Sequence, residues 1–305
     1  MKLKRIYNLQ KLITPGRVVF LYGPRRVGKT YLLTNFLQNY KGKAFLGIGD
    51  DLDLQEILAQ QSVNTYKKYF SEYDLIAIDE AQMIPNIGKY LKLLVDLFPN
   101  KYFIATGSSA LFLNQQVGEP LTGRKWEYTL YPLSVLELSY TFPNYDIMRN
   151  LEEYLLFGFY PEVINAKSLQ QKKKILYELV NSYLLKDILV FERLKSSVTL
   201  VKLLKLLAYQ IGSEVSLSEL ADNLNIDAKT VERYIDLLVK SFIIYPLGGF
   251  SRNLRKEITK KKKYYFIDLG IRNALIDNFE MLDTRPDKGT LWENFSYGTG
   301  KITYL

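Results

Sequence analysis

The segment FLYGPRRVGKTYLLTNF, residues 20–36, constrains this chain more than any other feature. An apolar run over residues 18–21 leads into a turn with a glycine at each end, and helix-forming residues from Tyr31 to Asn39 follow at once. Apolar β-branched runs favour strands, and three- and four-residue spacing of apolar positions favours a helix. The segment is therefore predicted to form a strand, a glycine-bounded turn and a helix.

The turn carries the pattern GxxxxGK[ST] in Gly23, Gly28, Lys29 and Thr30. Glycines permit backbone geometry that lets successive amides ring a phosphate group, and the positive end of the following helix assists them. Lys29 is expected to bridge the β- and γ-phosphates, and the Thr30 hydroxyl to ligate Mg²⁺. The alternative is a chance match on a surface turn, which the flanking strand and helix disfavour.

The interior of the loop is also expected to line the nucleotide. Pro24, Arg25, Arg26 and Val27 lie between the two glycines, so their backbone forms the rest of the cradle. The Arg25 and Arg26 side chains either contact phosphate or are solvated, and the sequence leaves both alternatives open.

Hydrolysis needs a carboxylate for the metal and another for the attacking water, and YDLIAIDEAQ supplies both. Residues 75–78 are predicted to form a buried parallel strand with Asp79 at its carboxyl end, where α/β sheets place ligands. Asp79 is expected to associate with Mg²⁺ through a coordinated water, and Glu80 to act as the general base. An acidic pair after a strand is a weak signal alone and a strong one together with the phosphate loop.

A third apolar run, KYFIATGSS, ends in Thr106 and a Gly-Ser pair. If this strand lies between the other two, Thr106 comes beside the γ-phosphate and orients water or senses the phosphate; otherwise the segment is a plain turn. Such an insertion marks the P-loop proteins whose base follows the aspartate, which disfavours nucleoside kinases and GTPases. No NKxD guanine-recognition motif follows, so adenine is the favoured base.

Composition excludes several classes of chemistry. The 305 residues include no histidine and no cysteine, so disulfides, thiolate nucleophiles, imidazole bases and His or Cys metal sites are absent. The net charge of +9 suits polyanionic partners or a solvated lysine-rich surface equally well. With no apolar run long enough to span a membrane and no secretory signal, the protein is expected to be cytoplasmic and not a membrane protein.

Helical patterns dominate after residue 130. Ser134 is predicted to cap a helix with Glu137 three residues on. A long helix is expected from Leu169 to Phe191, with an apolar stripe that forms core or, as the less favoured alternative, an oligomer surface.

Two short helices over SLSELADNLNI and DAKTVERYIDLLVKSFII, the second capped by Asp227, have the pattern of a helix-turn-helix. FIIYPLGGF is expected to add a wing-like strand, and RNLRKEITKKKKYYF a basic run. DNA is therefore a candidate partner through residues 216–263, with protein docking or internal packing as the alternative, because acidic residues share the second helix. The second helix is expected to expose Lys229, Thr230, Arg233 and Lys240.

The motifs GPRRVGKT, IDEAQ, ATGSSALFL, LTGRKWEYTLYPLSVLEL and GFYPEVI together resemble the bacterial and archaeal AAA-type P-loop ATPases that carry a C-terminal domain of unknown function. The similarity continues through NSYLLKDIL and KKYYFIDLGIRNALI, so it spans nearly the whole chain. Several separate motifs in the right order make it specific.

The resemblance implies an α/β fold with a parallel sheet flanked by helices, then a helical segment, a winged-helix-like domain and a partial nuclease-like α/β segment. It carries phosphate contacts to the loop residues, metal association to Asp79 and the base to Glu80. It also suggests Arg124 as a transition-state arginine, in cis or from a neighbouring subunit, with a plain surface arginine as the alternative. The expected boundaries are 1–138 for the ATPase domain, 139–195 for the helical linker, 196–250 for the winged-helix-like domain and 251–305 for the nuclease-like segment.

The C-terminal part departs from the family pattern. Asp268 and Glu293 match acidic positions of a nuclease-like fold, but no (D/E)xK motif follows Glu293, so no nuclease activity is expected. Relatives continue past LWENF with further strands, so the chain is expected to be truncated and residues after about 280 to be loosely held.

Two functions follow from these patterns. The first is a Mg²⁺-dependent ATPase whose cycle drives a conformational change in the helical and winged-helix parts, alone or as a homo-oligomer. The second is a nucleotide-gated DNA-binding or scaffolding protein, with a protein partner or DNA, in which hydrolysis is negligible.

Overall fold

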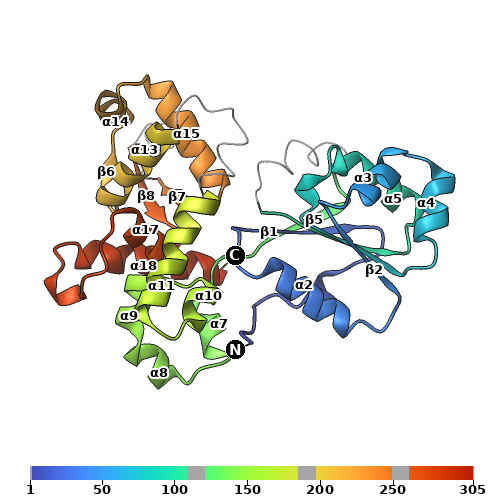
Figure 1. Ribbon diagram of the computed structural model, residues 1–305, viewed down its shortest axis with the longest axis horizontal. Helices are drawn as coiled ribbons and strands as arrows, with labels where there is room; N and C mark the ends of the chain where they lie inside the picture. The colour runs from blue at the N-terminus through green and yellow to red at the C-terminus, as the bar shows by residue number, and fades with distance from the viewer. Residues whose placement is uncertain (1, 109–120, 185–196, 249–260, 305) are drawn as a thin grey trace, which may run out of the picture. The chain divides into compact units, whose positions relative to one another are not determined.

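The chain folds into two units (Figure 1). The first comprises Arg5–Leu130, and the second comprises Met1–Lys4 together with Tyr131–Leu305. The first unit thus ends before the predicted boundary at residue 138. The Leu133 N–H donates to the Phe159 carbonyl at 2.9 Å, which joins this stretch to the second unit. The computed structural model describes residues 2–108, 121–184, 197–248 and 261–304.

A parallel five-stranded sheet forms the centre of the first unit. Its strand order is β2-β3-β4-β1-β5, so β4 lies between β1 and β3, as the sequence analysis required for Thr106. β1 and β3 are buried along their whole length, which explains why their sequences are continuous apolar runs. The strands are β1 (Val18–Tyr22), β2 (Ala44–Ile48), β3 (Leu75–Asp79), β4 (Tyr102–Thr106) and β5 (Lys125–Thr129).

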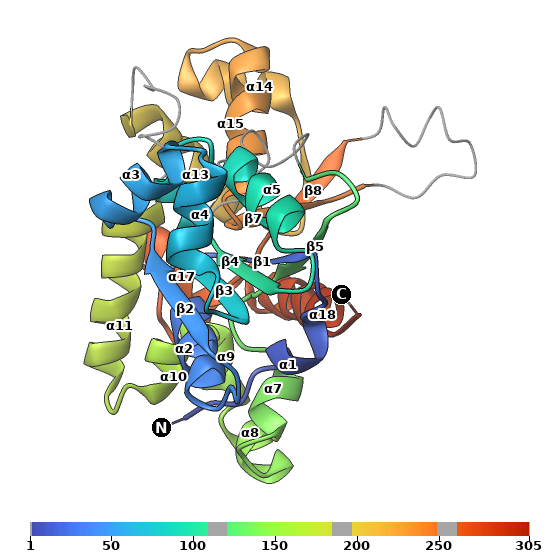
Figure 2. The same cartoon turned by 90° about the vertical axis from the view of Figure 1, so that its right-hand side faces the viewer.

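Helices cover both faces of this sheet. α1 and α2 lie on one face, and α3, α4 and α5 lie on the other (Figures 1 and 2). Side-chain caps start three of them, since Asn8 accepts from the N–H of residue 10, Asp51 accepts from the N–H groups of residues 53 and 54, and Ser62 accepts from that of residue 65. The helices are α1 (Leu9–Leu12), α2 (Lys29–Gln38), α3 (Leu52–Ala59), α4 (Val63–Phe70), the 3₁₀ turn η1 (Ala81–Met83) and α5 (Ile87–Leu97).

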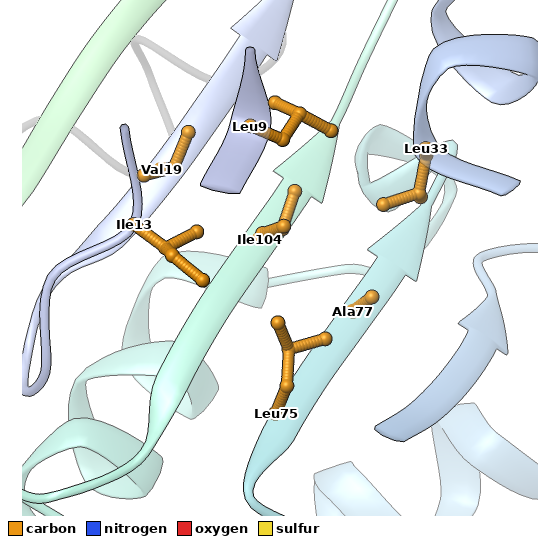
Figure 3. Packing of buried hydrophobic residues seen from close by; sticks show 7 residues of the cluster. All are labelled: Leu9, Ile13, Val19, Leu33, Leu75, Ala77 and Ile104. Carbon is orange, nitrogen blue, oxygen red and sulfur yellow. The ribbon is translucent and has the colours of Figure 1, made fainter. Parts of the chain in front are cut away.

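A hydrophobic core between the sheet and helices α1 and α2 fixes the strands that carry the candidate site. Side chains from the two helices pack onto β1, β3 and β4 in one cluster (Figure 3). Each fully buried leucine of this kind stabilises the fold by about 1.5–3 kcal/mol. The cluster therefore ties the three neighbouring strands together in fixed register. Its members are Leu9, Ile13, Val19, Leu33, Leu75, Ala77 and Ile104.

The second unit begins with short helices. The predicted capping box is confirmed, because the Ser134 hydroxyl accepts from the Glu137 N–H and the Glu137 carboxylate accepts from the Ser134 N–H. The helix predicted over 169–191 is α-helical only to Glu178, where a π-helical turn, Leu179–Leu184, shifts the hydrogen-bond register. Residues 185–191 of that prediction lie outside the described residues. The helices are α7 (Val135–Ser139), α8 (Asn144–Arg149), α9 (Leu151–Phe157), α10 (Pro161–Asn165) and α11 (Leu169–Glu178).

A small antiparallel sheet with order β6-β8-β7 follows. Its strands are accompanied by three helices, and Asp227 caps the third as predicted, accepting from the Thr230 N–H at 2.8 Å. The strand at 262–266 pairs with both other strands, so the boundary expected at residue 250 does not separate it from the preceding elements. The elements are α13 (Ser197–Tyr209), β6 (Glu214–Val215), α14 (Leu217–Leu224), α15 (Ala228–Lys240), β7 (Ile244–Leu247) and β8 (Lys262–Phe266).

The expectation that residues after about 280 are loosely held is wrong for residues 282–294. Leu282, Arg285, Leu291 and Asn294 are buried. Asn294 fastens the segment to β8, because its side chain accepts from the Phe266 N–H at 2.8 Å and donates to the Phe266 carbonyl at 2.9 Å. The elements here are α17 (Leu269–Leu275), the 3₁₀ turn η3 (Leu282–Thr284) and α18 (Lys288–Tyr304).

Candidate functional site

The loop between β1 and α2 has the backbone geometry that the glycine spacing predicts. Gly23, Arg26 and Gly28 have positive φ angles of 144°, 60° and 95°. A Cβ at Gly23 would lie 2.0 Å from the Leu130 carbonyl oxygen, whereas one at Gly28 would meet nothing within 4 Å. Gly23 is thus required by space and conformation, and Gly28 by conformation alone.

The residues between the two glycines of the loop are held by contacts with the rest of the protein. Pro24 and Val27 are buried, and the Val27 carbonyl accepts from Arg5 Nη1 at 2.6 Å. Arg25 and Arg26 are half-buried. The loop is therefore held from the protein side.

Lys29 is the first residue of α2, so the helix starts two residues before the predicted Tyr31. Gly28, in the left-handed region, turns the chain directly into the helix. The Lys29 side chain is 4% exposed, and its ammonium donates to the carbonyls of Gly23 and Pro24 at 2.9 and 2.8 Å. A buried cation needs such partners. Thr30 follows with an exposed side chain.

Asp79, Glu80 and Thr106 meet where β3 and β4 end. The Thr106 hydroxyl donates to Asp79 Oδ1 and accepts from the Glu80 N–H at 3.1 Å. Thr106 is fully buried and Asp79 nearly so. The structure thus brings these three predicted site residues together.

Glu80 begins a tight turn that sequence reasoning did not resolve. Its backbone is left-handed, with φ 50° and ψ 42°, and it leads directly into η1. Gln82 Nε2 donates to Glu80 Oε2 and to Ser108 Oγ, the latter at 3.2 Å. Sequence reasoning missed Gln82 because an amide two residues after a glutamate carries no signal of its own.

Arg124 lies at the other end of the sheet. Its carbonyl accepts from the N–H of Val18, the first residue of β1, whereas the loop follows Tyr22, the last. At about 3.3 Å per residue, roughly 13 Å of strand separates the two ends. The Arg124 side chain forms an ion pair with Asp96 at the end of α5. The structure does not bring Arg124 to the other site residues, which argues against a role in cis.

The donor set at the site suits Mg²⁺ bound partly by a nucleotide. Among the described residues, no group of three or more His, Cys, Asp and Glu side chains could hold a metal ion by itself. Mg²⁺ is commonly held by one or two protein oxygens together with phosphate and water. A single carboxylate, Asp79, and a hydroxyl, Thr30, fit that mode.

The two acidic residues expected at nuclease-like positions have structural contacts. Asp268 caps α17 and accepts from the Phe159 N–H at 2.6 Å, and its burial, which outweighs hydrogen bonds from backbone N–H groups, raises its pKa to about 6. Glu293 accepts from the Tyr265 hydroxyl at 2.6 Å and from Lys263 at 3.1 Å. The hydrogen bond from Tyr265, followed by that from Lys263, lowers the pKa of Glu293 despite partial burial.

The residues expected to face DNA are only partly available. Lys229 and Arg233 are exposed on α15. Thr230 is engaged in the cap, because its hydroxyl donates to Asp227 at 2.6 Å. Lys240 forms an ion pair with Asp236 at 2.6 Å.

Within the described ranges, no helix is both long enough and apolar enough to cross a membrane.

Two family models match the chain. Residues 15–139 match a model described as an AAA domain, and residues 148–282 match one described as a domain of unknown function (DUF8612). The AAA match contains the loop after β1 and the ends of β3 and β4.

Similar proteins come from archaea and bacteria. The uncharacterized protein MJ1544 of Methanocaldococcus jannaschii is 25% identical over 95% of this chain and 68% of its own length. An uncharacterized protein of Haemophilus influenzae is 26% identical over 83% of this chain and 68% of its own length. The uncharacterized protein Rv2008c of Mycobacterium tuberculosis is 26% identical over 94% of this chain and 63% of its own length.

Solved structures give weaker likenesses. The crystal structure of a DNA replication initiation factor aligns with a TM-score of 0.31 at 17% identity, over 94% of this chain and 90% of that one. A STAND protein with a tetratricopeptide repeat sensor from Pyrococcus horikoshii gives 0.32 at 13% identity, over 94% and 43%.

Four observations agree with one another. They are the parallel sheet with β4 between β1 and β3, the glycine-bounded loop, the cluster of Asp79, Glu80 and Thr106, and the AAA match. The chain therefore joins an AAA-type P-loop ATPase domain to a C-terminal domain of unknown function.

Proposed function

We propose that the protein hydrolyses ATP in a Mg²⁺-dependent reaction at the carboxyl ends of β1, β3 and β4. The observation that carries this proposal is the hydrogen-bonded group of Asp79, Glu80 and Thr106 at the ends of β3 and β4. β4 is the neighbour of β1, which leads into the loop. Neighbouring strands lie about 4.8 Å apart, so β1 and β3, with β4 between them, are separated by about 10 Å. A triphosphate and its metal ion fit that span.

The loop is proposed to bind the phosphates. Amides of residues 23–30 and the positive end of α2 face negative charge, and Lys29 exchanges its two carbonyl partners for phosphate oxygens. The bound Mg²⁺ would supply charge neutralisation, with Thr30 and Asp79 as its protein contacts. Asp79 already accepts from Thr106, which fixes the direction of its carboxylate.

Glu80 is proposed as the general base. Water attacks the γ-phosphorus, and Glu80 orients this water and takes its proton. The sequence contains no histidine or cysteine, so a carboxylate is the natural base here. Thr106, whose hydroxyl contacts both acidic residues, is proposed to register whether the γ-phosphate is present.

The decisive test is Glu80→Gln. The variant is expected to retain ATP and to lose turnover by about a hundredfold or more, because a carboxamide cannot accept the proton. Phosphate release and equilibrium ATP binding are measured on the same preparations, with GTP as the competing nucleotide. Turnover at the wild-type rate in Glu80→Gln would show that another group is the base.

We further propose that the ATP state is transmitted to the second unit and that assembly with a second copy completes the site. Arg124 is exposed and lies far from its own loop, so it is proposed to serve a neighbouring subunit. Its ion pair with Asp96 would have to open for that role.

A second candidate function is nucleotide-gated DNA binding through residues 216–263, or scaffolding, with negligible hydrolysis. The short turn between α14 and α15, with Asn225 left-handed, supports a helix-turn-helix. Exposed Lys229 and Arg233 favour a polyanion. Against it, Glu232 and Asp236 line a pocket of about 500 Å³ beside α15, together with Lys261 and Lys262, so the charge is mixed.

Salt distinguishes the DNA-binding candidate from protein docking. Contacts to DNA phosphates release counterions, so affinity is expected to fall steeply between 50 and 200 mM salt, by roughly 10³ or more if six or more phosphates are contacted. Affinity for duplex DNA that does not change with salt would remove DNA as a partner. Phosphate release with and without DNA then separates a gated ATPase from a switch that does not hydrolyse ATP.

A further inference from the structure

Gln82 occupies a buried position directly beside the proposed base. It belongs to η1, which starts at the residue after Glu80, and its side chain is 5% exposed. Its amide nitrogen donates to Glu80 Oε2 and to Ser108 Oγ. A carboxamide nitrogen has two hydrogens, and both are used here.

The orientation of this amide is determined by the carboxylate. Rotating the amide by 180° would satisfy its oxygen with the Ser108 hydroxyl. It would also set that oxygen against Glu80 Oε2, where two acceptors would face each other. A hydrogen bond to an ionised carboxylate is the stronger of the two contacts. Gln82 therefore holds one oxygen of the Glu80 carboxylate.

The same amide links the base to β4. Ser108 lies two residues beyond Thr106, which contacts Asp79 and the Glu80 N–H. The end of β4 thus reaches the acidic pair by two routes: Thr106 holds the backbone of Glu80, and Ser108, through Gln82, holds its side chain. A shift at the end of β4 would move both.

The backbone around Glu80 is fixed independently of Gln82. The Gly49 N–H donates to the Asp79 carbonyl at 2.8 Å, and a Cβ at Gly49 would lie 2.1 Å from the Glu80 carbonyl oxygen. Gln55 Nε2 donates to the Gly49 carbonyl at 2.7 Å and to the Met83 carbonyl at 3.4 Å. The contact of Gln82 with Glu80 is therefore not needed to form the turn.

The other end of the Gln82 amide is open. Its Oε1 is buried and accepts no hydrogen bond from any described residue. An orphan buried acceptor is costly, so the amide is held in this orientation by the two contacts of its nitrogen and not by its oxygen.

We propose that Gln82 is a positioning residue, which aims the Glu80 carboxylate at the attacking water and couples it through Ser108 to the end of β4. This inference rests on the proposed ATPase function and on the role of Glu80 as base. Gln82 itself touches neither substrate nor metal in this scheme, and it acts through the carboxylate that it holds.

Gln82→Met tests the proposal, since methionine keeps the length of the side chain and removes both donors. The value of kcat is expected to fall about ten- to a hundredfold, the worth of a hydrogen bond to a charged group, with KM for ATP unchanged. Ser108→Ala keeps the contact between Gln82 and Glu80, so its kcat is expected to fall less, about two- to tenfold. Gln10→Met, at an exposed position of α1, is the matched control, with kcat expected within about twofold of wild type.

A double-mutant cycle shows whether Gln82 acts through Glu80. In the Glu80→Gln background, Gln82→Met is expected to cause no further loss, because the carboxylate that it positions is gone. The proposal would be overturned if the double variant lost kcat by the product of the two single losses. It would also be overturned if Gln82→Met alone kept kcat within about twofold of wild type. Gln82→Leu, which also removes both donors and adds no charge beside Glu80, is expected to give the same loss of kcat and decides the matter if Gln82→Met does not fold.

The failure of this inference is distinguishable from failure of the proposed function. A wild-type protein without turnover would overturn both. A wild-type protein that hydrolyses ATP and is inactivated by Glu80→Gln, but not by Gln82→Met, would retain the ATPase and remove Gln82 from it.

Discussion

At the scale of single residues, the second unit contains a buried group of charges around Asp287. Arg272 and Arg285 are almost fully buried, and both donate to the Asp287 carboxylate, at 2.5 and 2.8 Å. Burial alone would raise the pKa of Asp287, but the hydrogen bonds and charges of the two arginines outweigh it and lower that pKa to about 2. The ionised form of Asp287 is therefore favoured over the protonated form more strongly in the folded chain than in the unfolded chain.

Asp287→Asn is expected to lower the free energy of unfolding at pH 7 by about 3–5 kcal/mol, since it leaves two buried guanidinium groups without a carboxylate. The folded pKa is depressed, so the wild-type advantage is present above about pH 4 and is lost as the pH falls towards 2. Denaturant unfolding in a Trp126→Phe background leaves Trp292, in the second unit, as the reporter. A difference between the two proteins that persists unchanged to pH 2 would contradict this account.

Asp268 also makes the stability of the second unit depend on pH. Burial raises its pKa to about 6, so its effect has the opposite sign. Its relative stabilisation is present below about pH 4 and is lost as the pH rises through 6. Both proteins contain Asp268, so its contribution cancels in the difference between Asp287→Asn and wild type at each pH.

Residues whose role depends on neighbours in sequence could be predicted, and those whose role depends on side-chain direction could not. Ser134 with Glu137 and Asp227 with Thr230 form the predicted caps, because a cap is local. Gln82 was missed because its contact depends on the left-handed turn at Glu80 and on a serine from another strand.

At the scale of elements, the length of β1 separates Arg124 from the loop. Both lie next to this strand, but at opposite ends. In a parallel sheet the carboxyl ends form one edge, so a residue before β5 cannot share the edge at which β1 ends. Any role of Arg124 in hydrolysis must therefore involve another copy of the chain.

Mixing two inactive variants tests this placement. Lys29→Ala lacks the phosphate contact but keeps Arg124, and Arg124→Ala has the reverse defect. If Arg124 acts in trans, mixed oligomers are expected to recover part of the phosphate release that each variant alone lacks. An Arg124→Ala protein with full activity would remove the residue from the mechanism altogether.

The order of the parallel strands could be anticipated, and the pairing of β8 could not. Thr106 and Asp79 belong together only if β4 lies between β1 and β3, and the sheet has that order. By contrast, β8 pairs with β6 and β7 across a long stretch of intervening chain. Such a long-range pairing has no local pattern, so the sequence does not reveal that residues 262–266 share a sheet with residues 214–215 and 244–247.

At the scale of the whole molecule, the two units differ in how much their residues indicate about function. The first carries the loop and the acidic pair and matches the AAA domain, whereas the second matches a domain whose function is unknown. The buried contacts of Asp268 and the paired charges on α15 explain why acidic and basic residues in the second unit do not by themselves indicate chemistry. The central claim therefore concerns the first unit.

Titration calorimetry of the whole chain with ATP and Mg²⁺ tests that claim most directly. The account predicts saturable heat at one nucleotide per chain, with affinity reduced about ten- to a hundredfold by Lys29→Ala, because the charged contact to phosphate is lost. Folded wild-type protein that gives no heat of binding with ATP and Mg²⁺ would contradict it.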